Sequence, residues 1–256
     1  MIFDTHAHYD DEAFDKDRDE LLKGMRSKGV EFIVNVGASM DSARKTLELA
    51  KKYPFVYAAM GVHPSETKEL TEEDMQWIKE AASCEKVVAI GEIGLDYYWP
   101  EPEPSIQKKW FERQLQLAGE VKLPVVVHSR DAAKDTLDIL KGWRKDLTKG
   151  VIHCFSYTKE TAREYLNMDY YFGIGGVLTF KNAKKLAEAA EYIPLERILL
   201  ETDCPYLAPE PYRGKRNQSD YIDFVAQKLS EIKKISKEEI LAKTMENARE
   251  FYGITE

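Results

Sequence analysis

Short apolar runs recur along the chain, and segments with helical spacing separate them. The runs cover residues 2–3, 32–36, 56–60, 87–90, 125–127, 151–152, 170–174 and 198–200. The helical segments cover residues 17–28, 40–52, 71–82, 106–121, 132–141, 159–167 and 182–192. Runs that are apolar at nearly every position are typical of strands buried on both faces, as in a parallel sheet covered by helices. The pattern therefore predicts an α/β fold in which eight parallel strands alternate with helices.

Eight strand–helix units close naturally into a (β/α)8 TIM barrel, and an open doubly wound sheet is the alternative. The open sheet is disfavoured because no GxGxxG motif follows the first strand, and the glycines within 173–176 lack the dinucleotide fingerprint. Two further helical segments follow the last strand, and the second opens at Ser236 with the pattern of a capping box. We therefore expect residues 1–256 to form a single TIM-barrel domain with C-terminal helices.

The composition disfavours several classes of protein. No stretch of about 18 apolar residues occurs, and the N-terminus has no basic region or hydrophobic signal core, so we expect no membrane insertion and a cytoplasmic location. Three cysteines without CxxC spacing argue against a disulfide framework or a structural zinc knuckle. The formal net charge of −8 argues against non-specific adhesion to nucleic acid, which depends on many phosphate contacts.

Imidazole and carboxylate groups follow the predicted strands at six positions. These are His6 and His8 after the first strand, Glu92 after the fourth, His128 after the fifth, His153 after the sixth and Asp203 after the eighth. Each residue alone is more often structural, but the carboxyl ends of all strands of a TIM barrel meet at one mouth, where the active site lies. Nitrogen and oxygen ligands of this kind suit divalent first-row metals, so the sequence predicts a metal site at that mouth.

The number of candidate ligands favours two metal ions over one. Six protein ligands would leave a single ion without an open position, whereas two ions bridged by a carboxylate would each keep room for water or substrate. We expect the ligands to divide into His6, His8 and Asp203 for one cation and His128 and His153 for the other, with Glu92 spanning both. Mixed nitrogen and oxygen ligands favour zinc, manganese or iron, and magnesium could serve in an assay.

Longer motifs surround these residues. They are His6-Ala7-His8, Gly61-Val62-His63-Pro64, Ile90-Gly91-Glu92-Ile93-Gly94-Leu95-Asp96-Tyr97, His128-Ser129-Arg130, His153-Cys154-Phe155-Ser156, Glu201-Thr202-Asp203-Cys204-Pro205-Tyr206-Leu207 and Pro211-Tyr212-Arg213-Gly214-Lys215-Arg216-Asn217. Together they resemble, almost from end to end, the TatD family of metal-dependent deoxyribonucleases within the amidohydrolase-like barrels. The resemblance implies a divalent-metal hydrolase that acts on DNA phosphodiesters as a 3′ to 5′ exonuclease, with single-stranded 3′ ends as a candidate substrate. It agrees with the division of ligands between two cations.

Roles within such a site follow from the chemistry of each group. A metal-activated water would attack the substrate, and Asp203 is either the general base that takes its proton or a ligand only, while Glu92 holds both cations. His63, the fifth histidine, either contacts substrate or braces its loop. Arg130 and the loop residues Arg213 and Arg216 either bind phosphate or pair with surface carboxylates. Tyr97, Tyr98 and Trp99 either stack on bases at the rim or pack into the protein.

Two other functions stay open. The same barrel and ion pair could hydrolyse a small amide, lactone or phosphotriester, because activated water attacks whatever electrophile is presented. The basic segment 211–217 favours phosphodiesters. A non-catalytic protein that uses metal for binding a partner is the second alternative, and six ligands that leave open positions on two cations argue against it.

Overall fold

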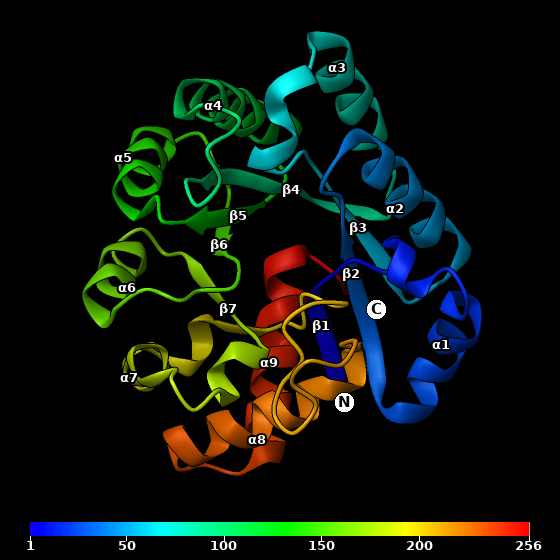
Figure 1. The fold of residues 1–256 in the computed structure, drawn as a ribbon, viewed down its shortest axis with the longest axis vertical. Coiled ribbons are helices and arrows are strands. Elements are labelled where there is room, and N and C mark those ends of the chain that lie inside the picture. Colours follow the sequence, from blue (N-terminus) through cyan, green and yellow to red (C-terminus); the bar gives the residue numbers. More distant parts are fainter. Residues whose placement is uncertain (256) are drawn as a thin grey trace.

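A computed structural model describes residues 1–255, and its eight parallel strands form the predicted barrel (Figure 1). The strands are hydrogen-bonded in chain order from β1 to β8. They are β1 (Ile2–Ala7), β2 (Val30–Val36), β3 (Val56–Met60), β4 (Val87–Asp96), β5 (Val125–Arg130), β6 (Gly150–Ile152), β7 (Tyr171–Ile174) and β8 (Ile198–Leu200). The prediction of a (β/α)8 barrel is therefore confirmed.

Helices surround the strands on the outside of the barrel, except for the last one, which lies across its opening (Figure 1). They are α1 (Arg18–Met25), α2 (Met40–Lys52), α3 (Glu72–Ala81), α4 (Pro104–Val121), α5 (Ala133–Trp143), α6 (Lys159–Leu166), α7 (Lys184–Tyr192), α8 (Ile222–Lys233) and α9 (Lys237–Tyr252). Ser236 begins α9 with the expected capping box, in which its side chain and that of Glu239 satisfy each other's backbone N–H groups. Within the described residues, no helix combines the length and the apolar character that crossing a bilayer demands.

Alternating side chains divide the apolar core into two layers. Along β2, Phe32, Val34 and Val36 belong to the core inside the barrel, whereas Ile33 packs in the outer layer against the helices. This alternation arises because successive side chains of a strand point to opposite faces. Both faces of the strands are thus buried, which explains why the sequence is apolar at almost every strand position.

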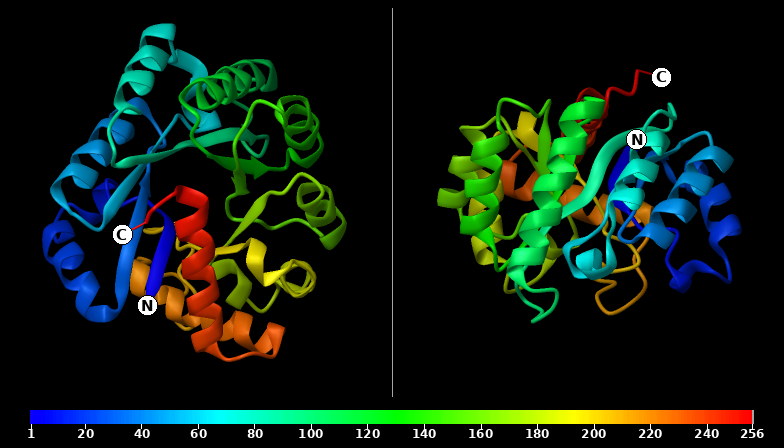
Figure 2. Two further views of the ribbon diagram at one scale, coloured as in Figure 1. Left: turned by 180° about the vertical axis from the view of Figure 1, so that it is seen from behind. Right: turned by 90° about the horizontal axis from the view of Figure 1, so that it is seen from above.

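Helix α9 closes the amino-terminal end of the barrel. Seen from behind, it crosses the opening beside β1 (Figure 2). Its residues Ala248, Phe251 and Tyr252 join the inner core, and the Tyr252 hydroxyl donates a 2.8 Å hydrogen bond to the backbone carbonyl of Thr5. The inner core is thereby sealed at one end only, and the carboxyl ends of the strands remain as the mouth.

Three strands run further toward the mouth than the apolar runs predicted. Strand β1 continues through His6, β4 through Glu92 and β5 through His128. The expectation that these residues follow their strands is wrong, because the ladder between β4 and β5 continues through polar positions and pairs Gly94 with His128 and Asp96 with Arg130. His128 is therefore held in a regular ladder, whereas the pairing shifts register around His6 in β1 and around Glu92 in β4.

The barrel closes between β1 and the segment after β8. Ala7 and Cys204 form a single parallel bridge there. The Asp203 amide donates a 2.9 Å hydrogen bond to the His6 carbonyl, and the His8 amide donates a 2.8 Å hydrogen bond to the Cys204 carbonyl. These bonds fix Asp203 directly beside His6 and His8, although almost 200 residues separate them in sequence.

Candidate metal centre

The alternation of the strands carries ligand side chains into the mouth. Val126 and Val151 point into the inner core. His128 and His153 come two positions later and therefore lie on the same face, above the apolar layer. The same step leads from Leu199 of the inner core to Glu201.

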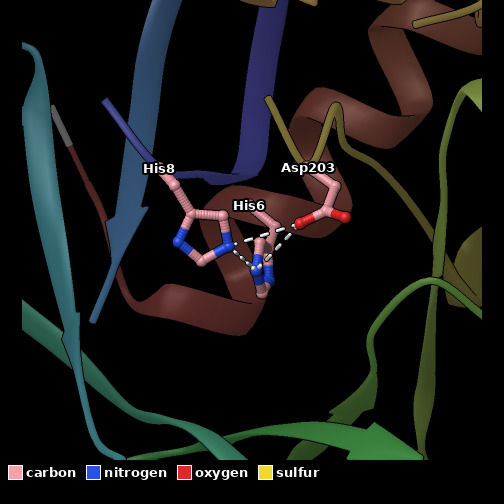
Figure 3. Close-up of side chains that lie close together, drawn as sticks. All are labelled: His6, His8 and Asp203. Atoms are coloured by element: carbon pink, nitrogen blue, oxygen red, sulfur yellow. Dashed lines mark hydrogen bonds and ion pairs between the residues drawn. The ribbon is translucent and has the colours of Figure 1, made fainter. Parts of the chain in front are cut away.

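His6, His8 and Asp203 form the first group of ligand atoms (Figure 3). The Nε2 atoms of His6 and His8 lie 3.1 Å apart. The Asp203 Oδ1 atom lies 3.3 Å from His8 Nε2 and 3.8 Å from His6 Nε2. Two imidazole nitrogens and a carboxylate oxygen thus converge on one point, as a divalent cation requires.

The orientation of His8 is set by a backbone carbonyl. Its Nδ1 donates a 2.8 Å hydrogen bond to the carbonyl oxygen of Val36, which can only accept. The neutral imidazole therefore presents its lone pair on Nε2, toward Asp203 and His6. Burial lowers the pKa of His8, but the hydrogen bond and negative charge of Asp203 and the charge of Glu92 outweigh burial and raise this pKa to about 9.

Glu92 lies between the first group and the two histidines predicted for a second cation, His128 and His153, which are called the second group below. Ligand atoms also lie within 4.8 Å of one another in two further sets, His63, Glu92 and His128 and His6, His153 and Glu201. Its Oε2 is 3.5 Å from His6 Nε2 and 3.9 Å from His8 Nε2. Its Oε1 is 2.8 Å from His128 Nδ1 and 3.6 Å from His153 Nε2. The two oxygens of one carboxylate thus face two different histidine pairs. Imidazole and carboxylate donors gathered in this way fit divalent metal.

Strong electrostatic coupling accompanies this geometry. Burial raises the pKa of Glu92, but His153, His128 and His6 together hold it well below its ordinary value. Burial likewise lowers the pKa of His153, and the charges of Glu201 and Glu92 raise it to about 10. The pKa of Asp203 is lowered because its histidine neighbours outweigh burial. The cluster therefore concentrates ionised carboxylates that attract positive charge.

Two carboxylates outside the predicted ligand set support its histidines. Asp96 Oδ2 lies 3.1 Å from His128 Nε2, on the ring edge away from Glu92. Glu201 Oε1 lies 3.1 Å from His153 Nδ1 and accepts a 2.6 Å hydrogen bond from the Cys154 amide. Carboxylates in this position orient a histidine and raise its basicity toward metal. The two-residue step from Leu199 to Glu201 was a signal for Glu201, whereas Asp96 looked like any other acidic residue after a strand.

A third carboxylate, Asp4, braces the same end of the barrel from below. It is fully buried and accepts hydrogen bonds of 2.6 Å from the Thr202 hydroxyl and 2.7 Å from the Ser219 hydroxyl. Burial raises its pKa to about 7, although these hydrogen bonds oppose the shift. Asp4 therefore ties β1, which carries His6, to the segment after β8, which carries Asp203.

His63 lies beside the second group and also braces its own loop. Its Nδ1 accepts a 3.2 Å hydrogen bond from the Ser65 amide, which leaves the ring proton on Nε2. That Nε2 lies 4.0 Å from Glu92 Oε1. Burial and the neighbouring His128 lower the pKa of His63 to about 4, so at neutral pH its uncharged ring offers one N–H toward the site.

The three candidate phosphate-binding arginines lie in different surroundings. Arg130 lines a cavity of about 730 Å³ over the metal ligands, together with His63, Asp96, Trp99 and Tyr206. Arg216 instead makes two hydrogen bonds to Asp17, of 2.7 and 2.6 Å. The Arg213 guanidinium lies 4.2 Å from the ring centre of Phe180. The structure therefore brings Arg130 to the site, whereas Arg213 and Arg216 are engaged by other side chains.

Comparisons with known proteins agree with this site. The family described as TatD related DNase matches residues 3–253. A relative in Bacillus subtilis named "uncharacterized metal-dependent hydrolase YabD" is 46% identical and covers 99% of this chain and 100% of its own length. A Citrobacter rodentium relative named "3'-5' ssDNA/RNA exonuclease TatD" is 33% identical and covers 99% of this chain and 98% of its own length.

A solved structure shows the same architecture. The crystal structure of YJJV, a TATD homolog from Escherichia coli, superimposes with a TM-score of 0.93 at 30% identity, over 99% of this chain and 98% of that one. An organophosphorus hydrolase from Deinococcus radiodurans, at 14% identity and a TM-score of 0.67, shares the fold alone. The full-length family match and these relatives place the chain in the TatD-related family of metal-dependent hydrolases.

Proposed function

We propose that this protein is a metal-dependent deoxyribonuclease that removes nucleotides from a DNA end in the 3′ to 5′ direction. The observation that carries the proposal is the position of Glu92, whose two carboxylate oxygens face separate histidine pairs on the floor of an open cavity. Two divalent ions held in this way are typical of enzymes that hydrolyse phosphate esters. The name of the Citrobacter relative supports a nucleic acid as substrate.

The proposal keeps the division of ligands expected from the sequence. His6, His8 and Asp203 would hold one cation, His128 and His153 would hold the other, and Glu92 would contribute to both. Zinc, manganese, iron or magnesium bound there would acidify a water molecule and polarise a phosphoryl oxygen.

Three further groups act on the substrate. Asp203 accepts the proton of the attacking water, because its carboxylate lies among the ligands and its side chain keeps 18% of its surface exposed to the cavity. His63 donates its Nε2 proton as a hydrogen bond to a phosphoryl oxygen. Arg130 binds phosphate from the rim, where its fixed positive charge can make two parallel hydrogen bonds.

The charge of the rim favours a chain end over the middle of a polynucleotide. Asp10, Asp11 and Glu66 line the cavity on one side, and Arg130 is the one lysine or arginine among the residues that line it. A polyanion that crossed the whole mouth would pass these carboxylates and be repelled. A terminal nucleotide can instead enter beside Arg130, which agrees with an exonuclease.

The test uses DNA labelled at its 5′ end, with chelated and metal-reconstituted protein. The proposal predicts a ladder of shortened labelled products that appears only after metal is restored and disappears in His128→Ala. Cleavage of a lactone or phosphotriester with the DNA left intact would instead indicate a small-molecule hydrolase. Metal binding without turnover on any of these substrates would indicate a non-catalytic binding protein.

A further inference from the structure

Exposed aromatic side chains gather on two loops at the carboxyl end of the barrel, and two of them, Trp99 and Tyr206, line the cavity. Among the described residues, five aromatic side chains are strongly exposed. Four of them, Tyr98, Trp99, Tyr206 and Tyr212, lie on the loops that follow β4 and β8, and Tyr192 at the end of α7 is the fifth. Loops after barrel strands form the substrate side of this fold, so the exposure of these rings coincides with the face that meets substrate.

Trp99 is held in place by groups that belong to the metal site. Its ring meets the ring of Tyr98 edge to face, with centres 4.8 Å apart and planes at 90°. The Tyr98 amide donates a 2.9 Å hydrogen bond to Asp96, whose other oxygen contacts His128. This chain of contacts connects the indole to a metal ligand.

The ring of Tyr98 also contacts Arg130, the arginine at the rim of the cavity. The Arg130 guanidinium lies 3.8 Å from the ring centre of Tyr98, a cation–π contact that fixes a long side chain. Trp99 and Arg130 therefore both contact the ring of Tyr98, and both line the cavity. Trp99 is nevertheless 54% exposed, so its packing against Tyr98 leaves much of the indole open.

We propose that Trp99 stacks on the base of the terminal nucleotide of a single-stranded chain while Arg130 binds a phosphate of that nucleotide. The inference rests on the proposed nuclease function and adds the reason for strand selection. An aromatic face stacks on any unpaired base without reading its sequence. A base within a duplex has both faces covered by its neighbours, so a paired end must fray before Trp99 can reach it.

The charge of the mouth sets the side by which the strand leaves. Asp10 and Asp11 come from the segment after β1 and Glu66 from the segment after β3, whereas Trp99 comes from the loop after β4 and Arg130 from β5. A single strand that stacks on Trp99 therefore runs over the part of the rim that bears the positive charge. The carboxylates after β1 and β3 repel it.

The test compares two single-stranded oligonucleotides that differ only in the 3′-terminal residue, which either carries a base or is an abasic tetrahydrofuran analogue. For the metal-loaded wild type, we expect removal of the base to lower kcat/KM about tenfold, because the stacking of one base on an aromatic ring contributes about that factor. Trp99→Ala should lower kcat/KM about tenfold on the intact end, mainly through KM, and leave the abasic end unchanged. Trp99→Phe should restore most of the preference, and Tyr192→Ala, which removes an exposed ring elsewhere, should behave as wild type.

The outcomes separate this inference from the proposed function. Equal losses on both oligonucleotides in Trp99→Ala would show that the indole only supports the site, and no loss on either would show that it does not meet the base. Either result would overturn the inference and leave the nuclease activity standing. Failure of the metal-loaded wild type to shorten any oligonucleotide would overturn both.

Discussion

The two ends of the barrel bury different kinds of side chain, polar at the mouth and apolar at the amino-terminal end. At the mouth, Glu92, His6 and His153 are buried polar groups that face one another. At the amino-terminal end, Phe3 and Phe251 are buried in an apolar core closed by α9. Burying charge without partners costs stability, whereas burying apolar surface supplies it. The closed end therefore stabilises a fold whose open end is kept for chemistry.

Activity and stability should therefore separate along the barrel axis. The mouth is held by backbone hydrogen bonds between β1 and the segment after β8, so loss of a ligand side chain leaves its frame intact. The closed end is held by side chains of α9, so loss of one of these side chains removes stabilising contacts directly.

The largest separation is expected for Glu92→Gln. Glutamine has nearly the same shape but carries one oxygen and one amide nitrogen, so it cannot offer an anionic oxygen to both histidine pairs. Turnover should fall by more than about 100-fold, the loss typical when a side chain that hydrogen-bonds to a metal ligand is removed. The amount of metal bound per protein should also fall below that of the wild type. Activity and metal content measured on a sample with an unchanged circular dichroism spectrum check this, with the exposed Glu188→Gln as control. Retained turnover would contradict the bridging role.

At the closed end, Phe251→Ala should unfold the protein more easily and spare its chemistry. Phe251 is 2% exposed and packs against Tyr171 and Tyr252. Loss of a buried phenyl ring costs about 3–5 kcal/mol of the free energy of unfolding. Urea unfolding of chelated protein measures this, and Tyr192→Ala should change stability by less than about 0.5 kcal/mol. If Phe251→Ala lost activity but kept the stability of the wild type, the separation of activity and stability between the two ends would be contradicted.

Asp96→Asn tests whether the outer carboxylate acts through the ligand. The amide can still accept from Tyr98 but no longer places a charge beside His128. Affinity for metal should fall about 10- to 100-fold, with folding unchanged. Titration with a competing chelator measures the affinity, and unaltered affinity would reduce Asp96 to a brace for the loop after β4.

Metal uptake should depend on pH because His8 and His153 are protonated at neutrality when no metal is bound. The pKa of His8 is about 9 and that of His153 about 10. A cation needs the neutral imidazole, so each histidine must release its proton below those values. Each cation affinity should therefore rise about tenfold per pH unit between pH 7 and 8. The protons released on metal binding can be measured with a pH-sensitive dye in a weakly buffered solution. Metal binding without proton release would contradict these pKa values.

The smallest effect is expected for Arg216→Ala, in contrast with Arg130→Ala. Arg216 is paired with Asp17 at the half-exposed surface, so its loss should cost about 1 kcal/mol or less. Arg130 lines the cavity, and its loss should flatten the salt dependence of oligonucleotide binding by about one phosphate contact. Fluorescence anisotropy at several salt concentrations compares them. A flattened slope for Arg216→Ala would return that arginine to the substrate.

The sequence predicted most of the architecture because both faces of the strands are buried. Apolar runs and helical spacing located all eight strands, and Met40–Lys52 has the predicted bounds. Polar positions inside a strand hid the extensions through Glu92 and His128, since their pairing depends on neighbouring strands. The pattern of apolar residues indicates which positions are buried, but it does not indicate which polar positions pair with a neighbouring strand.

The site was partly predictable for a related reason. Imidazoles are rare in this chain and stand out, whereas Asp96 and Glu201 are two among 45 acidic residues. The pairing of Arg216 with Asp17 joins positions 199 residues apart and left no local signal. Residues of an uncommon type at strand ends could be found from sequence, and contacts between common charged residues could not.

The proposed function depends most on a position of Glu92 between two cations. Diffraction from crystals soaked in manganese, measured at its absorption edge, tests this directly. Two anomalous peaks are expected, one among Glu92 Oε2, His6 and His8, the other among Glu92 Oε1, His128 and His153. A single peak, or peaks out of contact with Glu92, would contradict it.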